Sequence, residues 1–275
     1  QHNLGFMYAN GQGVTKNYET ALKWFTLAAE QGSAKSQNNL GFIYANGQGV
    51  SKNYEEALKW FTLAAKQGNP VSQHSLGFMY EKGEGISKDY PKALYWYTLA
   101  AEQGMDKSQH NLAVLHANGQ GTAVNHHLAF DWHTLAAEQG NVLSQRALGL
   151  MYKNGRGVSQ NYELAFDWFQ KAASQRDAES QHNLGFIHEN GLGKTQNYRK
   201  AFEWYILAAE QKFAASEHGL GFMYEKGLGV SRDYVEARKW YALAAEKGDK
   251  RSQHHLGRIY EKGLEVHKDY QLALH

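Results

Sequence analysis

The chain has 275 residues, of which 42% are hydrophobic and 13% aromatic, a composition that indicates a packed protein and argues against disorder. Its 29 basic and 27 acidic residues nearly balance at a net charge of +2 without any basic run, so we expect no nucleic-acid partner. It contains no cysteine, which excludes disulfides and thiol nucleophiles but leaves cytoplasm, periplasm and secretion open, and no 18-residue apolar stretch that would insert directly into a membrane.

The first stretch, NLGFMYANGQGV from residue 3, contains Gly11-Gln12-Gly13 before a helix-like segment, and such a turn could cradle phosphate. The same stretch returns at residue 39 and then every 36 residues to residue 255. Of 28 glycines, 27 occupy four positions of this period, and all seven tryptophans share one position. Because a catalytic loop occurs once and a structural turn occurs in every repeat, we interpret these glycines as turns.

Each repeat is predicted to form two helices. In the second repeat, Gln37, Leu40 and Tyr44 share one face of a first helix, which the glycines of residues 47–49 end. A second helix then presents its apolar side up to Gly68. An Asn or Asp precedes this second helix in every repeat and is predicted to cap it; these residues are Asn17, Asn53, Asp89, Asn125, Asn161, Asn197, Asp233 and Asp269.

One such helix pair cannot bury its wide apolar surface alone, so neighbouring pairs must stack. Pairs of alanines, such as Ala28 and Ala29, let helices approach closely, and the tryptophans are predicted to fill the space between pairs. We therefore predict an all-α fold, a right-handed α-solenoid of about seven and a half 36-residue helix-turn-helix repeats, forming a single domain over residues 1–275. The chain starts inside a first helix and stops inside a second, so we expect it to be cut within a repeat at both ends.

The repeat resembles the Sel1-like repeat, a relative of the tetratricopeptide repeat. The resemblance covers nearly the whole chain and is carried by Leu-Gly-x-x-Tyr-x-x-Gly-x-Gly-Val, then Tyr, then Ala-x-x-Trp-Phe/Tyr-x-x-Ala-Ala and a final Gly. In the second repeat these residues are Leu40, Gly41, Tyr44, Gly47, Gly49, Val50, Tyr54, Ala57, Trp60, Phe61, Ala64, Ala65 and Gly68.

The resemblance implies an adaptor that holds protein complexes together, with no enzymatic activity, no catalytic residue and no cofactor. This chain departs from the cysteine-rich bacterial branch of the family, in which disulfides staple the repeats. It also has serine where the family usually has alanine early in the first helix; these serines are Ser36, Ser72, Ser108, Ser144, Ser180, Ser216 and Ser252.

Two rows of residues turn away from the predicted core stripe of the first helices, and by resemblance to tetratricopeptide arrays they lie on the concave side. The histidine row is His2, Asn38, His74, His110, Arg146, His182, His218 and His254. The phenylalanine row is Phe6, Phe42, Phe78, Val114, Leu150, Phe186, Phe222 and Arg258. We predict that a protein or peptide partner binds Phe6, Asn38, Phe42, His74, Phe78, His110, Arg146, His182, Phe186, His218, Phe222 and His254.

The alternative is that these rows reflect duplication alone, with the phenylalanines partly covered by the next layer and the histidines solvated. No metal is expected, because layers about 10 Å apart cannot bring ligand nitrogens to about 2.1 Å from one ion.

The fourth repeat departs most from the pattern. Ala113 replaces a glycine, and His116, His126 and His133 stand where other repeats are mostly aromatic. One interpretation is that each imidazole half-fills an aromatic slot and finds a hydrogen bond. The other is a cluster of partly buried histidines that titrates near pH 6 and makes stability fall with pH. Elsewhere Arg176, Lys212 and Glu265 replace turn glycines, which would hold them in left-handed backbone at a cost of about 1 kcal/mol each or change the turn.

The leading functional hypothesis is a non-catalytic interaction scaffold whose concave groove binds a peptide or partner domain. The alternative is an inhibitor or immunity-type regulator that wraps a target enzyme. A hydrolase or carbohydrate-binding module is disfavoured, because the His, Asp and Glu residues mostly recur with the period or lie on exposed helix faces and form no unique constellation.

Overall fold

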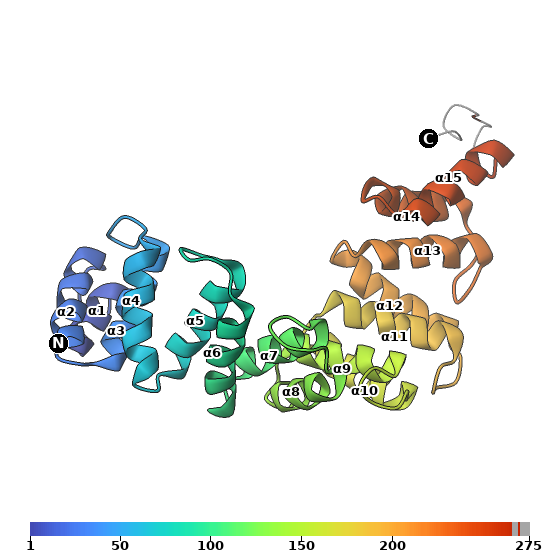
Figure 1. The fold of residues 1–275 in the computed structure, drawn as a ribbon. Coiled ribbons are helices and arrows are strands. Elements are labelled where there is room, and N and C mark those ends of the chain that lie inside the picture. The colour runs from blue at the N-terminus through green and yellow to red at the C-terminus, as the bar shows by residue number, and fades with distance from the viewer. Residues whose placement is uncertain (266–268, 270–275) are drawn as a thin grey trace. The chain divides into compact units, whose positions relative to one another are not determined.

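The computed structural model describes residues 1–265 and residue 269, and this part of the chain is all-α, as predicted. Its fifteen helices are α1 (His2–Asn10), α2 (Tyr18–Glu30), α3 (Ala34–Asn46), α4 (Tyr54–Lys66), α5 (Pro70–Lys82), α6 (Tyr90–Glu102), α7 (Asp106–Asn118), α8 (His126–Glu138), α9 (Val142–Asn154), α10 (Tyr162–Ser174), α11 (Ala178–Asn190), α12 (Tyr198–Glu210), α13 (Ala214–Lys226), α14 (Tyr234–Glu246) and α15 (Lys250–Lys262). Odd-numbered helices are the first helices of the repeats and even-numbered helices are the second helices, as the succession in Figure 1 shows. None of the described helices is both long and apolar enough to cross a membrane.

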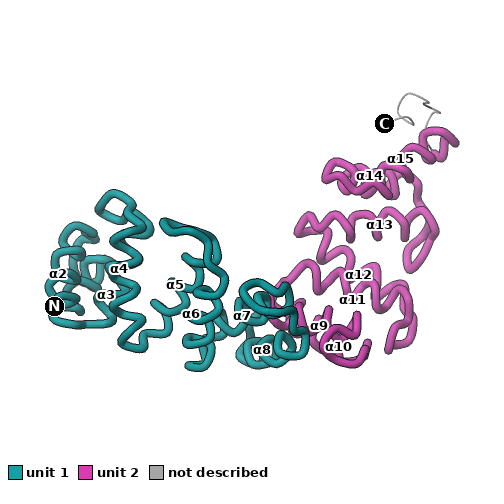
Figure 2. The backbone as a smooth tube through the Cα atoms, viewed as in Figure 1, with its two compact units in different colours: residues 1–141 teal, residues 142–275 magenta. Residues whose placement is uncertain are grey.

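The helices form two compact units, residues 1–141 and residues 142–275, which Figure 2 draws in teal and magenta. The first unit contains α1 to α8 and the second contains α9 to α15. Within each unit the contacts run mainly from each helix to the next along the chain. Weaker contacts join successive first helices, as in α3 with α5 and α9 with α11. This sequential packing confirms the α-solenoid, in which every repeat is stabilised by its immediate neighbours.

Each core cluster spans two repeats. Ala57 and Phe61 of α4 are buried against Leu76 and Met79 of α5, and Trp96 of α6 packs against the same cluster. Three elements therefore form this core: the second helix of one repeat, the first helix of the next repeat, and the tryptophan on the second helix of that next repeat. This arrangement confirms that the tryptophans fill the space between helix pairs.

A glycine inside most of the first helices makes room for an aromatic ring. A Cβ added to Gly41 would lie 2.5 Å from the Cδ1 atom of Phe61, far inside van der Waals contact. The turn glycine Gly47 has a different role, because it ends α3 with a left-handed φ of 68° that a side chain would strain.

The predicted second-helix caps are confirmed for the described helices. The side chains that accept a hydrogen bond from the backbone three residues later are Asn17, Asn53, Asp89, Asn125, Asn161, Asn197 and Asp233. Asp269 would cap the last predicted second helix, which lies outside the described residues. Arg176, Lys212 and Glu265 keep the left-handed backbone of the glycines they replace, with φ of 66°, 63° and 52°.

A chain of amide hydrogen bonds ties consecutive repeats together. Gln67 at the end of α4 donates to the side chain of Gln37 in α3, which donates to the carbonyl of Ala29 at the end of α2. The same two bonds recur for Gln103, Gln73 and Ala65. In the seventh repeat both amides change together, and a Lys247–Glu217 ion pair replaces them. Because both residues change, an ion pair replaces the amide hydrogen bond and the two helices stay connected.

Candidate functional site

The candidate site is the face formed by the first helices, here called the first-helix face. It carries the histidine row and the phenylalanine row, so each of the twelve predicted partner-binding residues lies on an odd-numbered helix. Their environments differ between the rows. The histidine row is engaged with other repeats, and part of the phenylalanine row is exposed.

Four histidines of this row each reach a buried serine in the following repeat. His74 Nδ1 lies 2.8 Å from the Oγ atom of Ser108, which is fully buried. The same pairing joins His2 to Ser36 at 2.9 Å, His182 to Ser216 at 3.0 Å and His218 to Ser252 at 2.9 Å. The serines that replace the family's alanine therefore link successive first helices.

The other side of each imidazole packs on the aromatic ring of its own repeat. The ring centroids of His74 and Tyr97 are 5.4 Å apart, and those of His182 and Tyr205 are 5.3 Å apart. The expectation of solvated histidines is therefore wrong for these residues, because each ring is held between a buried serine and an aromatic side chain. Exposed His254, the last of the row, contacts the ring of His255.

Burial keeps these imidazoles neutral. It is the largest cause that lowers the pKa of His74, His182 and His218 to about 4 each. Cationic neighbours act in the same direction, with Lys107 near His74 and Arg251 near both His182 and His218. His74, His182 and His218 thus contribute neutral hydrogen-bonding groups near pH 7.

Two members of the row that are not histidine show what the pairing requires. Asn38 accepts a hydrogen bond of 2.8 Å from the hydroxyl of Ser72, so an amide can replace the imidazole. Arg146 instead forms ion pairs with Asp177 at 2.9 Å and Glu179 at 3.3 Å. Its position leaves the buried hydroxyl of Ser180 without a hydrogen-bond partner among the described residues.

The phenylalanine row is most exposed in the first unit. Phe6, Phe42 and Phe78 are 46%, 38% and 38% exposed, whereas Phe186 and Phe222 are half-buried. A lysine lies over the ring of each half-buried phenylalanine, with Lys153 Nζ 4.5 Å from the Phe186 centroid and Lys226 Nζ 5.7 Å from that of Phe222. Lys82 Nζ lies likewise 5.8 Å from the centroid of Phe78, so the first unit differs in the greater exposure of its phenylalanine rings.

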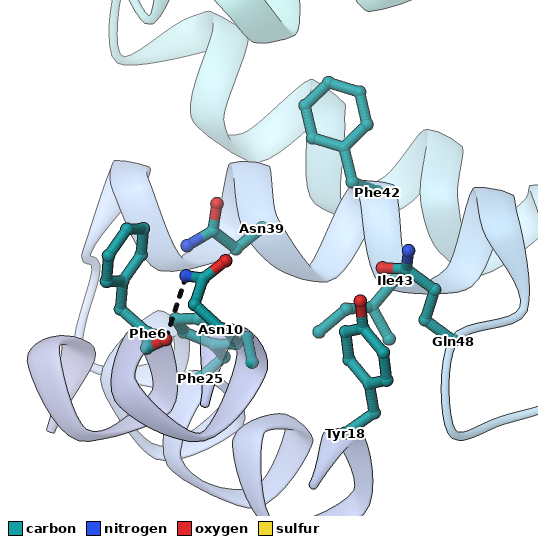
Figure 3. Close-up of a pocket in the computed structure, with 9 residues that line it drawn as sticks. Phe6, Asn10, Tyr18, Phe25, Asn39, Phe42, Ile43 and Gln48 are labelled. Atoms are coloured by element: carbon teal, nitrogen blue, oxygen red, sulfur yellow. Dashed lines mark hydrogen bonds between the residues drawn. The ribbon is translucent and has the colours of Figure 1, made fainter. Parts of the chain in front are cut away.

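A pocket of 290 Å³ opens on this face between α1 and α3, and we call it the α1/α3 pocket. Its lining residues are Phe6, Ala9, Asn10, Tyr18, Phe25, Asn39, Phe42, Ile43 and Gln48. Figure 3 shows Asn10 and Asn39 on one side of the pocket and Tyr18 and Gln48 on the other. The pocket has an apolar floor and a rim of uncharged polar groups.

The pocket coincides with a change at two positions that vary together along the chain. Where the ring of the second helix is tyrosine, its hydroxyl donates to a glutamate of the first helix: Tyr97 to Glu81, Tyr205 to Glu189 and Tyr241 to Glu225. At the α1/α3 pocket the corresponding residues are Phe25 and Ala9. Both polar groups are missing there, which leaves the floor apolar. This pairing was not predicted, although a comparison of the repeats with one another contains the signal.

The fourth-repeat histidines agree with neither prediction in full. His133 is buried, and burial is the largest cause that lowers its pKa to about 3, while burial also lowers the pKa of His116. The Nδ1 atom of His116 has no hydrogen-bond partner in the described chain, contrary to the expected bond. The ring of His133 packs on His110, with centroids 5.3 Å apart. The groups with lowered pKa extend along the histidine row and are not confined to this repeat.

The second unit has a more basic pocket of 370 Å³, lined by His218, Lys250, Arg251, His254 and His255. Two of these residues have acidic partners, because Arg251 forms an ion pair with Asp249 at 3.0 Å and His255 Nδ1 lies 2.7 Å from a carboxylate oxygen of Glu225. Within residues 1–265 and 269, no group of three or more His, Asp or Glu side chains has a geometry suited to a metal ion.

The fold and the repeat pattern define a helical-repeat protein. The Sel1 repeat family matches the chain in eight consecutive segments: residues 1–33, 34–69, 70–105, 106–141, 142–177, 178–213, 214–249 and 250–275. The chain therefore belongs to the Sel1 repeat family, whose repeat is related to the tetratricopeptide repeat.

Two solved structures share both sequence and fold with this chain. One is c5321, a protective antigen of uropathogenic Escherichia coli with the Sel1-like repeat fold, at 34% identity and a TM-score of 0.88. The match covers 99% of this chain and 66% of that one, so this chain spans slightly under two thirds of c5321. The other is a Sel1 repeat protein from Oxalobacter formigenes, at 32% identity and a TM-score of 0.76, covering 94% of this chain and 75% of that one.

A more distant match is the immunity protein Pa5087 from Pseudomonas aeruginosa, at 20% identity and a TM-score of 0.45 over 78% of this chain and 81% of that one. A likeness this low carries no information about function. No curated protein sequence shows significant similarity to the chain.

Proposed function

We propose that this protein is a non-catalytic scaffold that binds a protein or peptide partner on its first-helix face. The observation that carries the proposal is the exposure of Phe6, Phe42 and Phe78 at one position of three successive repeats. Large apolar side chains aligned on a surface usually mark an interaction site, and aromatic side chains often dominate binding energy. The row supplies three such anchors on consecutive first helices.

The histidine row supports this role indirectly. Its bonds to the buried serines connect α1 to α3 and α5 to α7, so they help to hold successive first helices in register. A binding surface on rigid elements loses less conformational freedom when the partner docks. In this proposal the predicted partner-binding residues have two roles. The phenylalanines provide contact area, and the histidines and Asn38 maintain the spacing of the first helices that carry them.

The scaffold assignment also rests on family membership. Sel1 repeats form a scaffold family that is generally non-catalytic. The titratable groups of this chain have structural partners that recur from repeat to repeat, as in the Tyr–Glu pairs and the His–Ser pairs. Such groups stabilise the stack and give no reason to propose a reaction.

Partner capture by matched variants tests the proposal. The test variant Phe6→Ser/Phe42→Ser/Phe78→Ser removes the exposed rings, and the control Leu27→Ser/Leu63→Ser/Leu135→Ser removes leucines that are 40–45% exposed on second helices. Each purified protein is crosslinked in lysate of the source organism, and the captured proteins are compared.

We expect a specific partner to be captured by the parent and the leucine control but lost from the phenylalanine variant. Circular dichroism of all three proteins should show equal helicity, because the replaced side chains are exposed. Capture that survives the phenylalanine changes, or that depends on the leucines instead, would overturn the proposed face.

A further inference from the structure

We infer that the α1/α3 pocket binds an uncharged segment of the partner polypeptide, with one aliphatic side chain on its floor and the adjoining peptide groups on its rim. This inference rests on the proposed scaffold function and specifies the chemistry that the first unit recognises. At 290 Å³ the pocket lies just under the about 300 Å³ at which pockets for drug-sized ligands begin. Its volume therefore suits one side chain and its neighbouring peptide groups.

The floor of the pocket selects an apolar group. Phe25 and Ile43 form it with Ala9, and no polar side-chain atom belongs to these three residues. Phe6 and Phe42 also line the pocket, and in Figure 3 the ring of Phe42 points away from Ile43. A hydroxyl or charged group placed on this floor would lose its hydration without gaining a partner, whereas an aliphatic side chain loses nothing there. This argument favours a peptide side chain over a sugar ring, whose edge carries hydroxyls all around.

The rim of the pocket carries uncharged hydrogen-bond donors and acceptors that surround the apolar floor. Among the described residues, the side chains of Asn39, Gln48 and Tyr18 form no hydrogen bond with the protein. A carboxamide both donates and accepts, which matches the N–H and C=O groups of a peptide backbone. No Lys, Arg, Asp or Glu lines the pocket, so the neighbouring residues of the bound segment are expected to be uncharged.

In the sixth repeat the counterpart of Asn39 already forms hydrogen bonds within the protein. Asn183, which corresponds to Asn39, accepts from Lys153 Nζ at 2.7 Å and donates to the carbonyl of Glu179 at 2.8 Å. Asn39 has Ala9 at the Lys153 position of the previous repeat and therefore lacks that lysine partner. The hydrogen-bonding capacity of Asn39 is left for a ligand.

Nuclear magnetic resonance titration of the full chain tests the inference with defined probes. The probes are the capped peptide acetyl-Gly-Gly-Leu-Gly-Gly-amide, its versions with Glu or Lys in place of Leu, and methyl N-acetylglucosaminide. The reporters are the side-chain methyl group of Ile43 and the side-chain amide of Asn39. We expect the Leu peptide to shift both signals, and the charged peptides and the sugar to leave them in place.

Two variants make the result specific to the pocket. Ala9→Glu/Phe25→Tyr installs the Tyr–Glu pair that three other repeats already contain, so the fold is expected to persist while the floor becomes polar and filled. Ala45→Glu/Phe61→Tyr makes the same change in the next repeat, where neither residue lines the pocket. The first variant should abolish the shifts and the second should preserve them. Asn39→Ala should weaken binding up to about tenfold through one lost hydrogen bond.

Equal shifts with the Leu, Glu and Lys peptides, shifts with the sugar alone, or no shift with any probe would overturn the inference. Shifts that persist in Ala9→Glu/Phe25→Tyr would also overturn it. These outcomes are separate from the scaffold proposal. The capture experiment tests whether the exposed rings of Phe6, Phe42 and Phe78 are needed for binding, and the titration tests whether a peptide fills the pocket. A parent protein that captures no partner would refute the scaffold while leaving the titration result to stand alone.

Discussion

At the residue scale, two departures from the repeat consensus are coupled changes at contacting positions. The seventh repeat replaces a Gln–Gln bond by the Lys247–Glu217 ion pair, changing both members. In the fourth repeat Ala113 accompanies His133, where other repeats combine a glycine with a six-membered ring. A Cβ at the equivalent Gly149 would approach the Phe169 ring to 2.5 Å, so a smaller imidazole is a physical reason for the alanine. We conclude that these substitutions compensate for each other.

The serine row provides the sharpest residue-scale prediction. Ser108→Ala leaves His74 Nδ1 without its partner, and we expect a loss of about 1–3 kcal/mol in the free energy of unfolding. Ser180→Ala removes a buried hydroxyl that has no partner in the described chain, so we expect no loss or a small gain. Urea unfolding of both variants measures the difference. Equal destabilisation by the two changes would show that the His–Ser contact contributes nothing.

At the element scale, the histidine row makes the packing of first helices sensitive to acid. His74, His182 and His218 are neutral when folded because burial lowers the pKa to about 4, whereas the unfolded chain binds protons near the ordinary value of 6.5. Their contribution is complete above pH 6.5 and is lost as the pH falls toward 4. Each histidine costs up to about 1.4 kcal/mol per pH unit in this window.

We predict that the thermal midpoint falls between pH 6.5 and 4.5, measured by circular dichroism. The variant His74→Asn/His182→Asn/His218→Asn should flatten this dependence while retaining the link, because Asn38 already bonds to Ser72 in this way. The variant Ala113→Gly/His116→Tyr/His126→Tyr/His133→Phe, in which the glycine makes room for the larger ring, should remove only part of it, since it leaves the histidine row intact. A parent with a flat profile, or an asparagine variant that is as acid-sensitive as the parent, would contradict this account.

The helices and their ends could be predicted because their causes are local. The Asn53 cap acts three residues along the chain, and Gly47 ends α3 through its own backbone. The partners of His74 could not be predicted in the same way. Ser108 is 34 residues distant, and only the stacking of repeats brings the two side chains together. Periodicity identified the row, but whether its imidazoles faced solvent or a neighbouring helix depended on tertiary packing.

The α1/α3 pocket shows a second limit of sequence reasoning. The repeat pattern predicts Phe6 and Phe42 as binding residues, but it does not indicate a binding role for Asn39 or Tyr18, which also line the pocket. The pocket lies where Ala9 and Phe25 stand in place of the Tyr–Glu pair that three repeats contain. The second repeat has the same combination at Ala45 and Phe61, so the repeat pattern indicated the face but did not locate the pocket on it.

At the scale of the whole molecule, neighbouring rows of the same helices differ in their contacts. The histidine row and the glutamine bonds connect repeats, whereas the phenylalanines of the first unit are exposed. A repeat protein can divide its residues in this way because each position recurs on every helix pair. Under the proposed function, this division gives the scaffold binding area without weakening its core.

Site-specific photo-crosslinking tests the central claim most directly. A photoreactive phenylalanine analogue is placed at Phe42 on α3 or, in a matched protein, at Leu63 on α4; both native side chains are about 40% exposed. The account predicts that illumination in source lysate joins a specific partner to the protein labelled at Phe42 and not to the one labelled at Leu63. Crosslinking of that partner from Leu63 alone, or none from Phe42, would contradict it.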